Sequence, residues 1–120
     1  MIKVLVVEDD PINMRLMREI LSVKGFTADE AEDGKIAVRK AEKEIYDLLL
    51  IDIGIPHIDG VEVMKIIKSK PGYENVPAIA VTSYAMKGDR ETFLEAGFDD
   101  YISKPIEVAD LIKRLERYRK

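Results

Sequence analysis

The chain lacks several features that would point to other classes of protein. It has no cysteine among its 120 residues, which excludes disulfide bonds and metal sites with thiolate ligands. No apolar run is long enough to cross a membrane, and the one that follows Met1 is too short for a signal peptide. The net charge is −4 and the basic residues are scattered, so the basic face of a nucleic-acid-binding protein is missing. We therefore expect a cytoplasmic protein that binds neither a membrane nor a nucleic acid.

The composition is typical of one globular domain. Hydrophobic residues make up 47% of the chain and charged residues 35%, which separates it from disordered proteins. A length of 120 residues suffices for one compact domain with a single core. The sequence contains no linker, low-complexity tract or internal repeat. We therefore predict one domain over residues 1–120, without an appended output domain.

Short apolar runs alternate with helix-forming segments along the whole chain. The run at residues 48–51 is hydrophobic enough to be buried on both faces, as central strands of parallel sheets are. The segment at 27–31 is more polar and is predicted near a sheet edge. Five strand–helix units with short connections predict an α/β fold, a parallel sheet with helices on both faces. Strands are expected at residues 2–7, 27–31, 48–51, 78–81 and 101–102, and helices are expected to begin near Pro11, Gly34, Gly60, Lys87 and Val108.

Acidic and hydroxyl side chains follow three of these strands at the point where each ends. Glu8 and Asp9 follow the first strand, Asp52 the third, and Thr82 the fourth. Open α/β sheets bind ligands at the carboxyl ends of their strands, so we expect these side chains to converge there. Carboxylates that lie close together repel one another unless a cation compensates their charge. Because hard divalent cations prefer oxygen ligands, we predict that Mg²⁺ (or Mn²⁺) binds here. The alternative is a solvated acidic rim without a ligand.

Lys104 adds a positive charge directly after the fifth strand. Its ammonium group and the Thr82 hydroxyl are both suited to phosphoryl oxygens. The first strand is not followed by a glycine-rich phosphate loop, which argues against a flavin or nucleotide carrier. A phosphoryl group would therefore be attached covalently, as an aspartyl-phosphate. Asp52, at the end of the most hydrophobic strand, is the candidate nucleophile.

Four motifs together resemble the receiver domain of two-component response regulators. They are VEDD at 7–10, DIGIP at 52–56 with DG at 59–60, AVTS at 80–83, and YISKP at 101–105. They occur in the expected order and cover essentially the whole chain. The runs at 13–16 and 85–89 look most like stand-alone receivers of a cell-division regulator type. The resemblance implies a flavodoxin-like, doubly wound (βα)5 fold with strand order 2-1-3-4-5.

The resemblance also implies which residues accept phosphate and bind metal. Asp52 would accept a phosphoryl group from a histidine kinase or a histidine phosphotransfer protein. Asp9, Asp52 and the backbone carbonyl of Gly54 would hold Mg²⁺ directly, and Glu8 would act through water. The chain would thus be a phosphoacceptor signalling protein rather than an enzyme acting on a separate substrate.

The readout of phosphorylation is implied in the same way. Lys104 would pair with the phosphoryl oxygens, Thr82 would move toward them, and Tyr101 would turn inward as an aromatic switch. The face made by the fourth helix, the fifth strand and the last helix would then change its protein contacts. Tyr101 could instead be ordinary core packing, which is common for aromatic residues.

A contact surface for the phosphoryl donor is predicted beside the acidic cluster. Ile12 and Met14 lie off the apolar stripe expected for the first helix, where the family docks its histidine donor. With Pro105 and Ile106 they would form the kinase contact, although single apolar surface residues are also common. The protein is expected to be a monomer that can dimerise on phosphorylation.

Gly54 is unusual for the family, which often has a larger side chain there. Tyr84, two residues after Thr82, could shield the phosphoryl group from water instead. A small metal-dependent phosphatase with an aspartate nucleophile remains an alternative function, but such enzymes generally carry a second aspartate where this chain has Gly54. A pseudo-receiver that never accepts phosphate is a further alternative, disfavoured by the complete set of acidic, hydroxyl and lysine residues.

Overall fold

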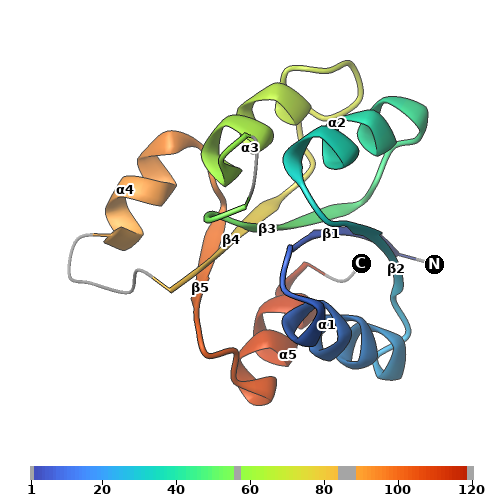
Figure 1. Cartoon of the computed structure of the whole chain (residues 1–120), viewed down its shortest axis with the longest axis vertical. Helices are drawn as coiled ribbons and strands as arrows, with labels where there is room; N and C mark the ends of the chain where they lie inside the picture. Colours follow the sequence, from blue (N-terminus) through green and yellow to red (C-terminus); the bar gives the residue numbers. More distant parts are fainter. Residues whose placement is uncertain (1, 56–57, 84–88, 119–120) are drawn as a thin grey trace.

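The chain folds into alternating strands and helices, shown in Figure 1 as a computed structural model that describes residues 2–55, 58–83 and 89–118. The predicted shield at Tyr84 and the expected helix start at Lys87 lie outside these residues. Within the described part, no helix is both long and apolar enough to cross a bilayer. The elements are β1 (Lys3–Val7), α1 (Pro11–Val23), β2 (Thr27–Ala31), α2 (Gly34–Lys43), β3 (Leu48–Asp52), α3 (Gly60–Lys68), β4 (Ala78–Thr82), α4 (Asp89–Ala96), β5 (Asp100–Ser103) and α5 (Val108–Arg117).

All five strands of the sheet are parallel, and their order is β2-β1-β3-β4-β5. Helices α2 and α3 cover one face, and α1 and α5 cover the other (Figure 1). The polar strand β2 lies at an edge, and every residue of β3 and β4 is buried. The predicted fold class and strand order are therefore confirmed.

Three helices begin at an aspartate that lies at the carboxyl edge of the sheet. Asp10, Asp33 and Asp59 each accept a hydrogen bond from a backbone N–H two or three residues later, at 2.9–3.0 Å. Such a cap stabilises a helix by about 1 kcal/mol because it satisfies an otherwise unpaired donor. Pro11 occupies the first turn of α1, where its missing N–H costs nothing. The caps fix how the chain turns away from the strand ends, next to the acidic side chains.

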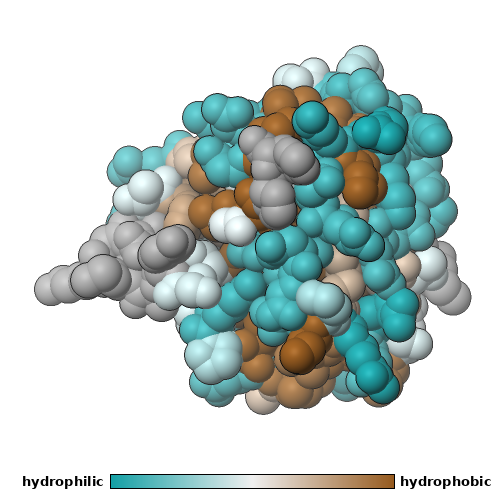
Figure 2. All heavy atoms as spheres, in the orientation of Figure 1, coloured by the Kyte–Doolittle hydropathy of each residue, from teal (hydrophilic) through white to brown (hydrophobic). Residues whose placement is uncertain are grey.

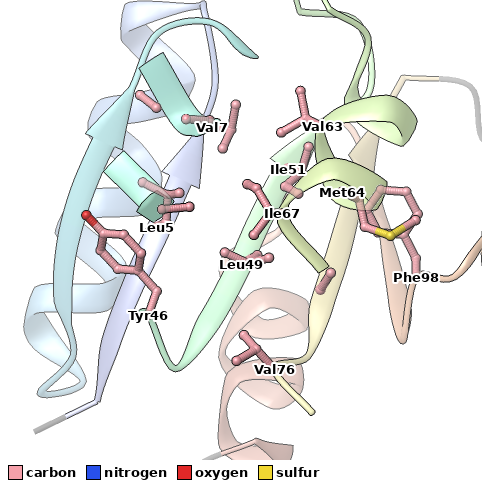
Figure 3. Close-up of a cluster of buried hydrophobic side chains, with 14 of the residues drawn as sticks. Leu5, Val7, Tyr46, Leu49, Ile51, Val63, Met64, Ile67, Val76 and Phe98 are labelled. Carbon is pink, nitrogen blue, oxygen red and sulfur yellow. The ribbon is translucent and has the colours of Figure 1, made fainter. Parts of the chain in front are cut away.

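The core consists of two clusters separated by the sheet. Along β1, Leu5 and Val7 point toward α2 and α3, while Val4 and Val6 point toward α1 and α5. Period-two alternation in a buried strand thus fills both clusters. Figure 3 shows the first cluster, in which Leu5, Val7, Leu49 and Ile51 from the strands meet Val63, Met64 and Ile67 from α3.

The placement of Met14 corrects the sequence prediction. Met14 is only 6% exposed and packs in the second cluster with Met17 and Leu21, so the prediction that it lies off the apolar stripe is wrong. Positions 14, 17 and 21 are three and four residues apart and share one helix face. Leu16 is only half-buried, at the margin of this face.

Candidate functional site

The predicted site residues converge at the carboxyl edge of the sheet. Oxygen atoms of Glu8, Asp9 and Asp52 all lie within 4.8 Å of one another. They come together because β1 and β3 are hydrogen-bonded neighbours in which Val7, the last residue of β1, is in register with Ile51, the residue before Asp52. Asp52 is the last residue of β3 and is 5% exposed. The expected acidic cluster is present, while the roles assigned to its members stay predictions.

Lys104 joins two of these carboxylates. Its Nζ donates to Asp52 Oδ2 at 3.1 Å and lies 3.0 Å from Glu8 Oε1. Burial by itself lowers the pKa of Lys104, but the contacts with Glu8 and Asp52 outweigh it and hold that pKa above its usual value. The site therefore contains a fixed cation in contact with the proposed nucleophile.

Glu8 is a buried carboxylate with incomplete compensation. It is 1% exposed, and burial raises its pKa to about 7; the Asp10 N–H lowers that pKa and nearby Asp52 raises it again. The Asp10 N–H donates to Glu8 Oε2 at 3.1 Å, but Oε1 accepts no well-directed hydrogen bond from the described residues. Lys104 Nζ, 3.0 Å from Oε1, and the Asp10 N–H offset only part of the cost of burying this carboxylate, so its pKa stays raised.

The donor set fits a hard divalent cation. Three carboxylates supply oxygen ligands, the kind that Mg²⁺ and Mn²⁺ prefer. Lys104 supplies one positive charge against three carboxylates, so this edge of the sheet favours a further cation. We therefore take Glu8, Asp9 and Asp52 as the residues able to hold such an ion.

Gly54 lies beside Asp52 and leaves space around it. Its N–H donates to Asp52 Oδ1 at 3.2 Å. A Cβ at Gly54 would meet no atom of the described residues within 4 Å. Among the described residues, the space next to the Asp52 carboxylate is therefore open on this side, and the metal-binding role of the Gly54 carbonyl stays a prediction.

The two predicted switch residues end β4 and occupy β5. Thr82 is 1% exposed, and its carbonyl accepts from the Lys104 N–H at 2.8 Å. The Tyr101 ring is half-buried and stacks on Phe93 of α4, with centroids 6.1 Å apart and planes at 29°. Tyr101 is therefore in contact with α4, a position compatible with both a packing role and a switch.

The predicted partner contact is reduced by the burial of Met14. Ile12 is 78% exposed at the start of α1, Pro105 is exposed, and Ile106 is half-buried between β5 and α5. The Lys104–Pro105 bond is cis. Figure 2 shows apolar surface gathered over α1 and α5, at the bottom of the view. Of the four residues predicted to contact the phosphoryl donor, Ile12, Pro105 and Ile106 remain accessible to a partner, and Met14 does not.

A cavity next to the acidic cluster had not been expected from the sequence. It has a volume of about 250 Å³ and lies between α1 and the end of β2. Asp9 belongs to its wall, together with Arg15 of α1 and Glu32 after β2. Single charged residues far apart in the sequence give no sign that they are neighbours. Only the packing of α1 beside β2 shows that these three residues line one cavity.

Comparison with a protein family agrees with this geometry. The chain matches the response regulator receiver domain family over residues 4–116. It is 38% identical over 115 residues to the polar-differentiation response regulator DivK of Brucella anthropi, covering 96% of this chain and 94% of that protein. DivK of Brucella ovis matches at the same identity and coverage.

Solved structures show the same relationship. The receiver domain of the sensor histidine kinase PA1611 from Pseudomonas aeruginosa PAO1, with a magnesium ion coordinated in its active-site cleft, superposes with a TM-score of 0.87 at 38% identity, over 97% of this chain and 95% of that one. The chemotaxis protein CheY4 of Vibrio cholerae gives a TM-score of 0.91 at 26% identity, over 99% of both chains. The arrangement of acidic residues and lysine at the strand ends, the strand order and these matches establish that the chain belongs to the response regulator receiver domain family of two-component signalling.

Proposed function

We propose that this protein accepts a phosphoryl group on Asp52 from a histidine kinase or a histidine phosphotransfer protein. The observation that carries the proposal is the position of Lys104, whose ammonium group contacts both Asp52 and Glu8 at the carboxyl edge of the sheet. An ammonium group at this position can donate hydrogen bonds to the oxygens of a phosphoryl group attached to Asp52.

The transfer step follows from the chemistry of the carboxylate. An Asp52 oxygen attacks the phosphorus of the donor phosphohistidine, a new P–O bond forms, the P–N bond breaks, and the imidazole leaves. Glu8, Asp9 and Asp52, with the Gly54 carbonyl, would hold Mg²⁺, whose charge would reduce the repulsion between the anionic nucleophile and the anionic phosphoryl group. Lys104 then exchanges its contact with Asp52 for one with the phosphoryl oxygens.

The signal would leave through the face formed by α4, β5 and α5. An aspartyl-phosphate adds charge and strong hydrogen-bond acceptors at one strand end. Thr82 and Lys104 can donate to phosphoryl oxygens only in that state, so these hydrogen bonds would shift the population toward the conformation that allows them. Tyr101, which contacts α4 through Phe93, would carry the change outward.

The donor would dock beside the site on Ile12, Pro105 and Ile106. We place this interaction in the cytoplasm and expect a monomer that can dimerise when phosphorylated. The DivK relatives, which are response regulators, support the role as a phosphoacceptor, and the magnesium ion in the PA1611 receiver supports a metal at the acidic cluster.

The direct test is intact-mass measurement after incubation with Mg²⁺ and phosphoramidate. The native chain should gain the mass of one phosphoryl group, and Asp52→Asn should not. Asp47→Asn is the matched control, because Asp47 is an exposed carboxylate just before the other end of β3. Addition of a chelator in place of Mg²⁺ should suppress the adduct. No adduct in the native chain with Mg²⁺, or an undiminished one in Asp52→Asn, would contradict the proposal.

A further inference from the structure

Asp100 is a buried carboxylate that the phosphorylation chemistry does not use. It begins β5 and is 2% exposed. A carboxylate at that depth is tolerated only when charged or hydrogen-bonding groups compensate it. Among the described residues, its carboxylate accepts from two arginines of α5 and from one backbone amide of β5.

Arg114 is the partner with the most informative contacts. Its Nη1 donates to Asp100 Oδ1 and also to the backbone carbonyl of Tyr101 at 2.9 Å. The Tyr101 N–H donates at 2.8 Å to the same Asp100 oxygen. Arg114 and Asp100 together therefore hold the backbone of Tyr101 at both its N–H and its carbonyl.

Arg117 compensates the same carboxylate in a different way. Its Nη1 donates to Asp100 Oδ2 at 3.0 Å, and its side chain is 55% exposed. None of its contacts in the described part of the chain reaches Tyr101. Both arginines thus compensate the charge of Asp100, but of the two only Arg114 also donates a hydrogen bond to the Tyr101 backbone in the described part of the chain.

The location of these contacts links three elements. Strand β5 lies between α4 and α5 (Figure 1). The Tyr101 ring stacks on Phe93 of α4, and the Tyr101 backbone is held by Arg114 of α5. A guanidinium group has directional donors and holds two acceptors in a set geometry better than a point charge does. A displacement of Tyr101 therefore has a direct, hydrogen-bonded route to α5.

We propose that Arg114, acting with Asp100, is a positioning residue that couples Tyr101 to α5, so that phosphorylation at Asp52 changes α5 through this contact. The inference rests on the proposed function, because it concerns how the same switch is read out. Arg114 touches none of the residues that hold metal or phosphate, so its loss should leave phosphoryl transfer intact.

The test compares Arg114→Gln with Arg117→Gln, which removes an arginine from the same carboxylate without touching Tyr101. Each variant is phosphorylated with Mg²⁺ and phosphoramidate, and its phosphorylation rate is followed by intact mass. Amide chemical shifts in β5 and α5 are recorded by ¹⁵N-correlated NMR before and after phosphorylation. A merely structural contact would lower the melting temperature but leave these phosphorylation-dependent shifts unchanged.

We expect all three proteins to be phosphorylated at rates within about twofold of one another, because the reacting groups are unaltered. In Arg114→Gln the phosphorylation-dependent shifts of α5 should fall by about twofold or more, the change that loss of a coupling contact typically produces. They should persist in Arg117→Gln. If Arg114→Gln does not fold, Arg114→Lys keeps a charge beside Asp100 but not the two-acceptor geometry, and it should show the same loss.

The outcomes separate the two proposals. Full α5 shifts in the folded Arg114 variant, or an equal loss in Arg117→Gln, overturn the coupling role while leaving Asp52 as the acceptor. A native protein that is phosphorylated without any α5 response also overturns it. A native protein that takes up no phosphoryl group overturns the proposed function and the coupling role together.

Discussion

Replacing Glu8 by glutamine should stabilise the metal-free protein at neutral and alkaline pH, although it removes a charged contact. Glu8 is 1% exposed, and one of its oxygens accepts no well-directed hydrogen bond from the described residues. Burial raises the pKa of Glu8 from 4.5 to about 7, so its ionised form is disfavoured in the folded state. Glutamine has nearly the same shape and carries no charge.

The magnitude follows from the linkage between protonation and folding. One pKa unit corresponds to about 1.4 kcal/mol, so a shift from 4.5 to about 7 amounts to about 3 kcal/mol at most. Because the folded-state pKa is the higher one, the favourable contribution of Glu8 is complete below pH 4.5 and is lost as the pH rises through about 7. Above that pH the penalty is constant. For a domain of this length it corresponds to about 10 °C in melting temperature.

The assay is urea unfolding in the presence of a chelator, from about pH 5 to about pH 8, the range over which this linkage acts. The free energy of unfolding of Glu8→Gln, relative to the native chain, should rise by about 2–3 kcal/mol across it. The control is Glu32→Gln, an exposed carboxylate in the wall of the adjacent cavity, and its profile should stay parallel to the native one. Added Mg²⁺ should stabilise the native chain more than Glu8→Gln. If the native and Glu8→Gln profiles are parallel over the whole range, the reasoning about Glu8 is refuted.

Three further substitutions test the packing that supports the site. Gly60→Ala should destabilise the protein by about 2 kcal/mol, measured by urea unfolding, because a Cβ there would lie 2.5 Å from the Asp52 carbonyl oxygen; stability equal to the native chain would show that the helix start can move. Gly54→Ala should keep native stability in the same assay, because its Cβ would meet nothing within 4 Å in residues 2–55, 58–83 and 89–118; a large loss would mean that this space is not open. Tyr73→Phe should lower the melting temperature through a loss of about 2 kcal/mol, because the buried Tyr73 hydroxyl accepts from the Tyr46 N–H at 3.2 Å; an unchanged melting temperature would contradict this.

Much of the site could be predicted because each of its residues directly follows an apolar strand. The carboxyl ends of parallel strands share one edge, so Glu8, Asp52 and Thr82 had to lie near one another once the strands were recognised. Met14 was misplaced because the buried face of a helix is set by how the helix is rotated about its axis against the sheet. The sequence pattern gives this rotation only approximately, so a residue at the edge of the apolar face can be assigned to the wrong side. Asp100 was missed because a single aspartate at a strand start carries no signal of burial. Only the packing of α5 on β5 places its two arginines against it.

The sequence by itself determined the alternation of strands and helices, the parallel sheet and the order in which acidic, hydroxyl and lysine side chains reach one edge. These follow from local patterns, namely apolar runs, helix caps and glycines, that act over a few residues. The tertiary structure decided what depends on distance and dielectric: the contact of Lys104 with both Glu8 and Asp52, the raised pKa of Glu8, and the grip of Arg114 on the Tyr101 backbone. Charge interactions and burial depend on which distant segments meet, so these properties arise only when the helices pack on the sheet.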